Sequence, residues 1–377
     1  MPQKESETMI LGMPSPTWKH LLGIQKKNNG KGFYELKYDH ILWLAKSSMS
    51  IRLVIEAVKS TKKQNSIKVL VPDYFCYETI SDIESEYTII EYYPIDESFE
   101  PKWDYLKEWC KNNSFDVMIF THYFGKYIES ISRAKEICKS MDAILIEDCA
   151  HVLMPTGKMG TNGDFTILSP HKQLGVMDGA ILYHNENAAK LLSQEVAERI
   201  DNVYSTMPQN HMSLVWNIKR GIQKIVPVHR SLKYFYGVHY GGKKEEKTKV
   251  LRCSPDSLVY LKNIQSVDMK IYASKRRRNL ELMNYIITKL YPEVVPCLDS
   301  SINSPYMAAY SLKNVTSKEM VVNDMMKKGF ILLFWPDLPH AIEEDACYES
   351  AKDMSKEYLF LPIHQGLRHQ ELIKKYL

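Results

Sequence analysis

The first half of the chain alternates short apolar runs with stretches whose apolar residues recur at helical spacing. The apolar runs predict strands at residues 67–71, 87–93, 117–121 and 143–146. Residues 129–141 lie between the last two runs and have helical spacing, which predicts a right-handed parallel crossover. Strands that are apolar along their whole length are typical of a sheet covered on both faces.

Two further apolar runs, at 165–168 and 180–183, flank a short polar loop. After about residue 190 the pattern becomes helical, and it predicts helices at 188–204 and, as one long element, at 256–290. The remainder mixes short strands and helices and is typical of a smaller α+β domain. The pattern therefore predicts an α/β fold with a mixed, mostly parallel sheet between helices.

Length and composition support two domains in this α/β fold. A chain of 377 residues with 45% hydrophobic residues can bury a large core. We predict a large domain at 1–250 and a small C-terminal domain at 251–377. The formal net charge of +4 is too small to indicate nucleic acid as a partner.

One segment, 216–252, is strongly basic, with ten Lys and Arg against two Glu. It contains Gly241-Gly242 and is predicted to be a mobile linker within the large domain. It could meet the diphosphate of a nucleotide, or it could be a solvated basic face or contact a membrane surface.

The cysteines and the N-terminus indicate the cellular compartment. The seven cysteines contain no CxxC pair, which favours free thiols in a reducing compartment over disulfides or a metal site. The N-terminus has no apolar core of signal-peptide type. No apolar run reaches the roughly 20 residues that span a membrane. We therefore expect a soluble, cytoplasmic protein without a transmembrane segment.

A lone lysine, Lys172, lies in the polar loop between the runs at 165–168 and 180–183. The loop begins Ser169-Pro-His-Lys172, and its glycines allow tight turns and close approach of the backbone to a bound molecule. An unprotonated lysine amine can form an imine with a carbonyl compound. Taken alone, Lys172 is more simply explained as one of many solvated lysines.

An acid upstream changes that interpretation. Asp148 follows the apolar run at 143–146 and should lie at the carboxyl end of a strand, where open α/β sheets bind ligands. A carboxylate there can keep a pyridine nitrogen protonated, and His151 can lie over the ring or reach its phenolic oxygen. The alternative is an N-cap aspartate with a surface histidine. An imine-forming lysine and such an acid are what a pyridoxal phosphate enzyme requires.

Three further groups of residues are candidates for cofactor contacts. Ser48, Met49 and Ser50 lie at the start of an amphipathic helix, where free N–H groups bind anions such as phosphate, although plain N-capping explains the serines equally well. One of the aromatic residues after the strand at 67–71, with Tyr74 and Phe75 as candidates, could stack on the ring, while core packing is the default for the others. His122, after the strand at 117–121, is either a site residue or a core histidine.

These motifs resemble the DegT/DnrJ/EryC1/StrS family of sugar aminotransferases. The likeness is carried by Val71-Pro-x-Tyr74, His122-x-Phe-Gly125, Glu147-Asp-Cys-Ala-His151, Gly163-Asp-Phe165, Ser169-x-x-Lys172 and Asp178-Gly-Ala180, and it resumes at Lys275-Arg-Arg-Arg-Asn279 and Leu361-Pro-Ile-His-Gln365. The chain departs from the family pattern at Met49-Ser50, where Gly-Thr is usual. Residues 200–255 also lack the Gly-x-Asn loop that reaches the partner subunit's phosphate.

The resemblance implies a fold type I enzyme that carries pyridoxal phosphate on Lys172, with Asp148 and His151 as its catalytic partners and Ser169 at the phosphate. It also implies a homodimer with shared active sites and a role in polysaccharide biosynthesis. The implied reaction moves an amino group from an amino acid, with glutamate as the expected donor, to a keto group on a nucleotide-linked sugar.

Other chemistries remain open within this resemblance. One branch of the family carries histidine in place of the lysine and dehydrates sugars, and His171 stands beside Lys172 here. The presence of Lys172 favours transamination. The alternatives are a pyridoxal phosphate-dependent transferase or lyase acting on amino acids, and a non-catalytic, regulatory member of the same fold.

Overall fold

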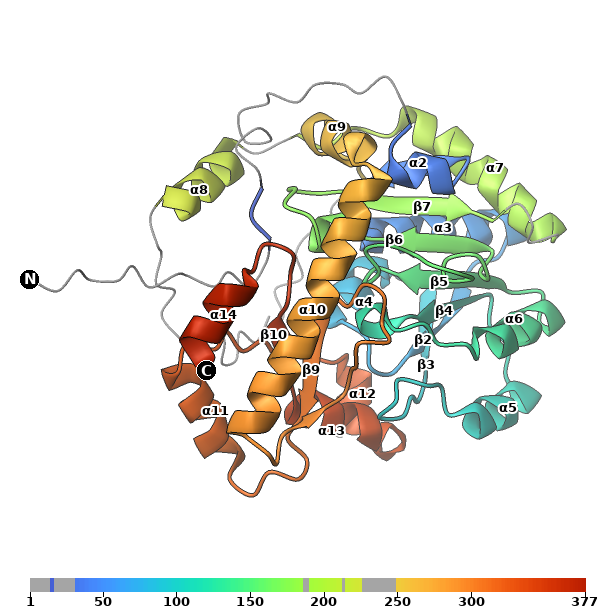
Figure 1. Cartoon of the computed structure of the whole chain (residues 1–377). Coiled ribbons are helices and arrows are strands. Elements are labelled where there is room, and N and C mark those ends of the chain that lie inside the picture. The colour runs from blue at the N-terminus through green and yellow to red at the C-terminus, as the bar shows by residue number, and fades with distance from the viewer. Residues whose placement is uncertain (1–13, 17–30, 186–189, 212–213, 226–248) are drawn as a thin grey trace, which may run out of the picture.

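The computed structural model describes residues 14–16, 31–185, 190–211, 214–225 and 249–377. Within them, a large mixed sheet lies between helices and a smaller antiparallel sheet lies beside it (Figure 1). This arrangement confirms the predicted α/β class. Most of the predicted mobile linker, including Gly241-Gly242, lies outside the described residues.

The large sheet has seven strands in the order β1-β7-β6-β5-β4-β2-β3. Strand β7 is antiparallel to both of its neighbours, and the pairs from β6 to β3 are parallel. Every residue of β4, β5 and β6 is buried, as expected for strands covered on both faces. The strands are β1 (Ile41–Leu44), β2 (Ile67–Pro72), β3 (Thr88–Tyr93), β4 (Val117–Thr121), β5 (Ile144–Cys149), β6 (Phe165–Leu168) and β7 (Ala180–His184).

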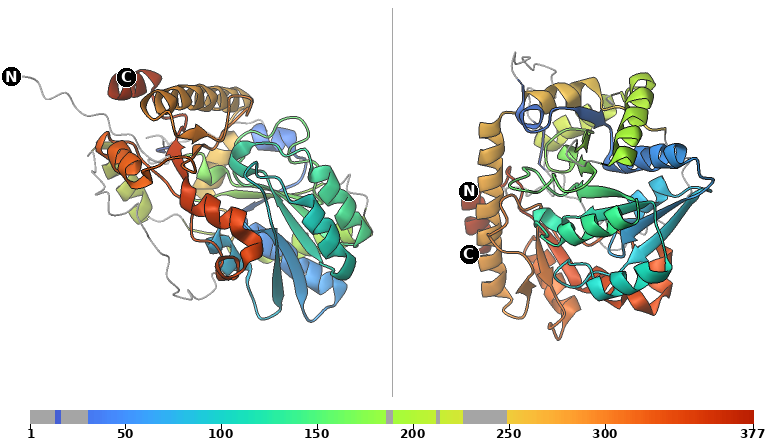
Figure 2. Two further views of the ribbon diagram at one scale, coloured as in Figure 1. Left: turned by 90° about the horizontal axis from the view of Figure 1, so that it is seen from below. Right: turned by 90° about the vertical axis from the view of Figure 1, so that its right-hand side faces the viewer.

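Helices cover both faces of this sheet. The right-handed crossovers place α3 (Ser47–Lys62) and α4 (Tyr77–Ile83) on one face and α5 (Trp103–Asn112) and α6 (Ile131–Ser140) on the other, with the sheet between them (Figure 2). Helix α7 (Leu191–Thr206) packs against α3. The predicted crossover helix at 129–141 is confirmed as α6.

Four further elements belong to this part of the chain. Helix α2 (Phe33–Lys37) contacts the helix α9 (Pro255–Asn263). Helix α8 (Leu214–Ile225) covers the start of the basic segment. Two 3-10 turns, η1 (Tyr123–Gly125) and η2 (Pro170–Lys172), follow β4 and β6. No helix in the described ranges is long and apolar enough to cross a membrane.

The C-terminal part is built on the long helix α10 (Ser266–Leu290) and a three-stranded antiparallel sheet in the order β10-β9-β8. Its other elements are β8 (Val295–Pro296), β9 (Met307–Ser311), α11 (Lys318–Lys327), α12 (His340–Glu344), η4 (Ala346–Tyr348), α13 (Glu349–Glu357), β10 (Tyr358–Pro362) and α14 (His369–Tyr376). One hydrophobic core runs from the large sheet into these elements. The domain boundary at residue 250 stays a prediction.

The structure corrects the single helix predicted at 256–290. Two helices are present, α9 (Pro255–Asn263) and α10, separated by Ile264 and Gln265 in extended conformation. The Ile264 carbonyl, freed from helical bonding, accepts the N–H of Phe33 at 2.8 Å. Gln265 and Asp268 form a capping box that starts the second helix. A long-range backbone contact and a local cap together break a pattern that looks continuous in sequence.

Candidate functional site

A cavity lies where the carboxyl ends of β4 and β5 and the loop after β6 meet the N-terminus of α3. The space inside it, counted together with the open solvent at its mouth, is about 380 Å³. Four predicted site residues line it: Phe75, Asp148, His151 and Lys172. The parallel sheet explains the meeting, because strands β4 to β6 all end at this edge.

Lys172 is the last residue of the turn η2, directly after β6. Pro170 begins the turn, and the N–H groups of Lys172 and Gln173 donate to the carbonyls of Ser169 at 3.0 Å and Pro170 at 2.9 Å. These bonds leave the Lys172 side chain half-buried and on the cavity wall. The turn therefore presents an amine to the cavity from a short, hydrogen-bonded stretch of backbone.

Asp148 faces the same cavity from the end of β5 and is buried. Its Oδ1 accepts the N–H of Ala150 at 2.9 Å, and its Oδ2 accepts the hydroxyl of Thr121 at 3.4 Å. Burial raises the pKa of this carboxyl above its usual value, while the charge of Lys172 and the Ala150 N–H lower it. A buried carboxylate that lines the same cavity as an amine is suited to holding a positively charged ring nitrogen.

His151 lies among aromatic rings at the edge of the cavity. Its ring is nearly parallel to that of Tyr306, with centroids 4.5 Å apart and planes 13° apart, and it also stacks on Phe124 at 5.6 Å. Nδ1 accepts the N–H of Phe124 at 3.4 Å, which assigns the ring hydrogen to Nε2. Burial and the nearby charge of Lys172 hold its pKa well below the usual value, so the ring is neutral at pH 7.

The predicted phosphate residues lie near the cavity but do not line it. Ser47, the first residue of α3, lines the cavity, whereas the Ser48 hydroxyl donates to Asp82 at 2.5 Å. Met49 and Ser50 are buried in the same first turn, and the Ser50 hydroxyl has no partner within the described part of the chain. The helix has no side-chain N-cap, so its first N–H groups are left for an anion.

Ser169 lies between β6 and the turn η2 and is fully buried. Its hydroxyl is 3.1 Å from Nδ1 of His171, which also donates to the carbonyl of Gly179 at 3.0 Å. Burial lowers the pKa of His171 to about 4, so it is uncharged. Ser169 does not line the cavity, and its contact with a phosphate stays a prediction.

Of the two aromatic candidates, Phe75 and Tyr74, only one lines the cavity. Phe75 lines the cavity. Tyr74 is fully buried and stacks on Trp335 with ring centroids 4.2 Å apart, and it does not line the cavity. Trp335 comes from the C-terminal part of the chain and itself lines the cavity. Phe75 is therefore the better placed of the two to stack on a bound ring.

Asp73, just before this aromatic pair, gives a prediction about stability. It is fully buried, its Oδ1 accepts the N–H of Ile95 at 3.1 Å, and burial raises its pKa to about 7. The unfolded value is about 3.9, so the folded state binds more protons between these values and stability falls as the pH rises from about 4 to 7. Asp73→Asn removes this slope and should stabilise the protein at pH 8 by up to about 4 kcal/mol.

Urea unfolding of this variant from pH 4 to 8 measures the effect. The gain should shrink almost to nothing near pH 4, where Asp73 is protonated in the folded state and about half-protonated in the unfolded state. Asp104→Asn, on an exposed position of α5, serves as the surface control. A constant difference between Asp73→Asn and the unmodified chain across this range would contradict the prediction.

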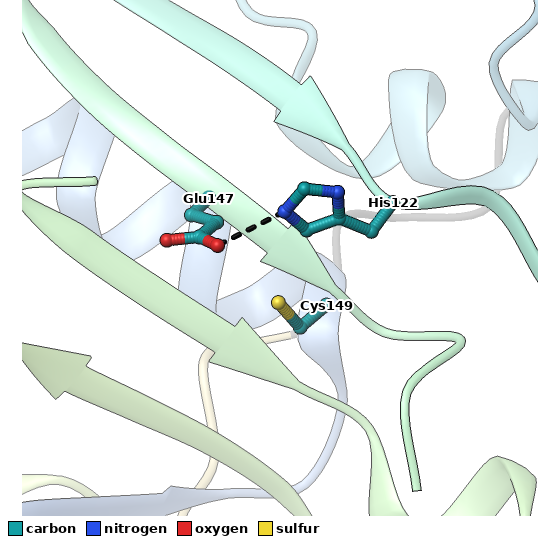
Figure 3. A group of neighbouring side chains, drawn as sticks. All are labelled: His122, Glu147 and Cys149. Atoms are coloured by element: carbon teal, nitrogen blue, oxygen red, sulfur yellow. Dashed lines mark hydrogen bonds and ion pairs between the residues drawn. The ribbon is translucent and has the colours of Figure 1, made fainter. Parts of the chain in front are cut away.

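His122 is buried and does not line the cavity. Figure 3 shows the buried group to which it belongs, in which its ring faces Glu147. Its Nδ1 accepts the N–H of Ile128 at 3.2 Å, and its Nε2 donates to Glu147 at 2.9 Å. With Cys149, His122 and Glu147 form a group whose side chains are of the types that bind metal ions. Both ring nitrogens are already used, and burial raises the pKa of the Cys149 thiol far above its usual value. These contacts favour a structural group over a metal site, in line with the core alternative for His122.

Several cavity residues were not predicted from the sequence. Thr121 and Tyr123 flank His122 and could have been found as neighbours of a strand end, and Cys76 and Thr79 follow the aromatic pair. Trp335 gives no local signal, because it reaches the cavity through long-range packing. The other unpredicted residues are Ser47, Ile51 and Ala150.

Comparison with known proteins identifies a related family. Residues 80–202, which contain Asp148, His151 and Lys172, match the model of the DegT/DnrJ/EryC1/StrS aminotransferase family. No curated protein sequence matches the chain. The predicted resemblance is thus confirmed by an independent comparison.

Solved structures of low sequence identity share the fold. Helicobacter pylori PseC, an aminotransferase involved in the biosynthesis of pseudoaminic acid, is 14% identical with a TM-score of 0.65, covering 96% of this chain and 98% of its own. The Escherichia coli GDP-4-keto-6-deoxy-D-mannose-3-dehydratase with bound hydrated PLP is 14% identical with a TM-score of 0.65, covering 97% and 98%. A DegT DnrJ EryC1 StrS aminotransferase from Brucella abortus is 13% identical with a TM-score of 0.62, covering 91% and 86%.

Proposed function

We propose that the chain is a pyridoxal phosphate-dependent aminotransferase acting on a nucleotide-linked ketosugar, because residues 80–202 match the model of the DegT/DnrJ/EryC1/StrS aminotransferase family. The amino donor is an amino acid, with glutamate as the expected one. The observation that carries the proposal is one cavity lined by Lys172, Asp148 and His151.

The residues present fit this cofactor. An amine, a carboxylate and a neutral imidazole face one cavity, as an aldehyde, a pyridine nitrogen and a phenolic oxygen require. The uncapped N-terminus of α3, with Ser47 on the cavity wall and the unpartnered hydroxyl of Ser50 in its first turn, suits a phosphate. Lys172, Asp148, His151, Phe75 and Ser47 would therefore hold the cofactor.

When bound, pyridoxal phosphate acts as an electron sink that makes the Cα–H bond of an attached amino acid acidic. Lys172 would supply the amine that holds the cofactor, and its freed amine would act as base and acid for the proton of the amino acid's Cα. Asp148 would keep the ring nitrogen protonated. His151, whose ring stacks on Tyr306 and Phe124, carries its hydrogen on Nε2 and would donate it to the phenolic oxygen.

The lysine is better placed for this role than its neighbour. Lys172 lines the cavity, whereas His171 does not and is hydrogen-bonded to the Gly179 carbonyl. The sugar-dehydrating branch of the family uses a histidine in place of the lysine. The placement of the two side chains therefore supports amino transfer over dehydration.

Spectroscopy of the purified protein tests the proposal. We expect uptake of added pyridoxal phosphate with a visible absorbance band, and borohydride should fix a pyridoxyl group on the peptide that contains Lys172. Lys172→Ala should lose both signals, while Lys158→Ala, at an exposed position, should keep them. A protein that stays colourless, or that links the cofactor through another lysine, would contradict the proposal.

Turnover then separates aminotransferase from the alternatives. Glutamate alone should give stoichiometric 2-oxoglutarate, and a subsequent nucleotide ketosugar should be recovered with an amine in place of its carbonyl oxygen. Turnover of amino acids and keto acids without any sugar product would favour an enzyme of amino-acid metabolism. Cofactor binding without reaction with any donor would favour a regulatory protein. A homodimer with shared sites, a cytoplasmic location and a role in polysaccharide biosynthesis stay predictions.

A further inference from the structure

Arg276, in the middle of α10, is a fully buried arginine whose recorded hydrogen-bond acceptors are all uncharged. Its Nε donates to Oε1 of Gln365 at 2.8 Å, its Nη1 to the carbonyls of Pro305 at 3.2 Å and Tyr306 at 3.0 Å, and its Nη2 to the carbonyl of Gln173 at 3.1 Å. Burial lowers its pKa to about 10, so it remains charged at neutral pH. A buried charge is costly, and a well-packed apolar side chain would often stabilise a fold as well. Stability alone therefore does not explain why a charged arginine is buried at this position.

The bonds of Arg276 converge on the turn that carries Lys172. Gln173 is the next residue, and its carbonyl accepts a second bond, from Nε2 of Gln365 at 2.8 Å. One turn along α10, Asn279 donates to the carbonyls of Ile363 and His364 and so holds the segment that carries Gln365. Two motifs far apart in the sequence, at 275–279 and 361–365, thus meet at one peptide group beside the candidate lysine.

The same guanidinium also holds Tyr306, the residue on whose ring His151 stacks. Its Nη1 bonds to the carbonyl of Tyr306, whose ring stacks on His151, and the Tyr306 N–H donates to Phe124 at 2.9 Å. Arg276 therefore links the backbone next to Lys172 with the backbone of the residue against which His151 packs. Neither link depends on a side chain that lines the cavity.

We propose that Arg276 and Gln365 are positioning residues. They fix the turn that carries Lys172 relative to Tyr306, the residue on whose ring His151 stacks. This inference rests on the proposed function for its catalytic consequence. A lysine amine sits at the end of a long flexible side chain, so its position depends on how firmly the backbone below it is held. A displacement of about 1 Å in a reacting group can lower a rate by about 100-fold.

Two substitutions with one control test the proposal. Gln365→Glu keeps an oxygen that can accept from Arg276 but loses the N–H that reaches the Gln173 carbonyl, and Arg276→Lys keeps the charge but cannot reach three segments at once. Arg278→Gln, at an exposed position of the same helix, is the control. We expect kcat to fall by about 10- to 100-fold in both variants, with a smaller change in the KM for glutamate. The visible circular dichroism of the bound cofactor should change, and the control should match the unmodified protein.

Hydrogen exchange separates this proposal from the proposed function. Amides of residues 172–174 should exchange faster in both variants than in Arg278→Gln, measured without cofactor at equal margins below each unfolding temperature. Unchanged exchange there would overturn the positioning role whether or not the protein binds pyridoxal phosphate. Lower thermal stability with unchanged kcat and unchanged circular dichroism would also overturn it, because a purely structural arginine gives that result.

Discussion

Replacing Asp148 by asparagine is expected to lower the rate of amino transfer by about 100- to 1,000-fold while the protein still folds and binds its cofactor. The amide oxygen can still accept the Ala150 N–H, which holds Oδ1 at 2.9 Å. It cannot carry the negative charge that keeps a ring nitrogen protonated. The loss should therefore appear in kcat for the reaction with glutamate, measured by stopped-flow absorbance.

Thr121→Val provides the matched control for this prediction. Thr121 also lines the cavity and donates to the other carboxylate oxygen of Asp148 at 3.4 Å, so its removal weakens one hydrogen bond but leaves the charge. A loss of no more than about tenfold is expected. Equal losses in the two variants, or full activity in Asp148→Asn, would show that the carboxylate charge is not what the reaction uses.

The strands that form the site are the part of the fold that the sequence predicts best. Strands β4 and β6 begin and end where the apolar runs do, because strands buried on both faces are apolar throughout. Asp148 lies at the carboxyl end of β5 and Lys172 in the turn that follows β6, so their meeting follows from the parallel pairing of these two strands. The central chemistry of the site was predictable for this reason.

Other parts of the site depend on contacts that leave no local pattern. Trp335 lies far along the chain from Asp148, and it reaches the cavity because the residues beside it pack onto the strand β10, with Leu333 and Phe360 paired as a bridge. The start of α3 at Ser47 was not predicted, because the neighbouring serines can serve equally well as caps or as helical residues. The four-residue strand β1 was missed, since so short a run has no distinct period.

Replacing Glu147 by alanine is expected to destabilise the protein by about 3–5 kcal/mol, the largest effect on stability that we predict. This carboxylate is fully buried and accepts the N–H groups of Gly160 at 2.6 Å, Asn162 at 2.7 Å and Gly163 at 3.1 Å, as well as Nε2 of His122 at 2.9 Å. Without it, these donors would be left in the interior with no acceptor. The loop that leads into β6, and through it to Lys172, should loosen first. Urea unfolding at pH 7 measures the loss.

The pH dependence of unfolding tests whether Glu147 stabilises the protein as an anion. Burial alone would raise the pKa of Glu147, but the hydrogen bond from His122 and the backbone N–H groups outweigh it, and the net shift is downward. A lowered folded pKa means that the stabilisation is complete above the unfolded value of about 4.3 and is lost as the pH falls through the folded value. The gap between the unmodified chain and Glu147→Gln should accordingly be largest near pH 7 and shrink in acid. Glu108→Gln, on the exposed side of α5, should unfold with the same free energy as the unmodified chain at every pH. If the destabilisation of Glu147→Gln grows in acid instead, this carboxylate does not hold the loop as an anion.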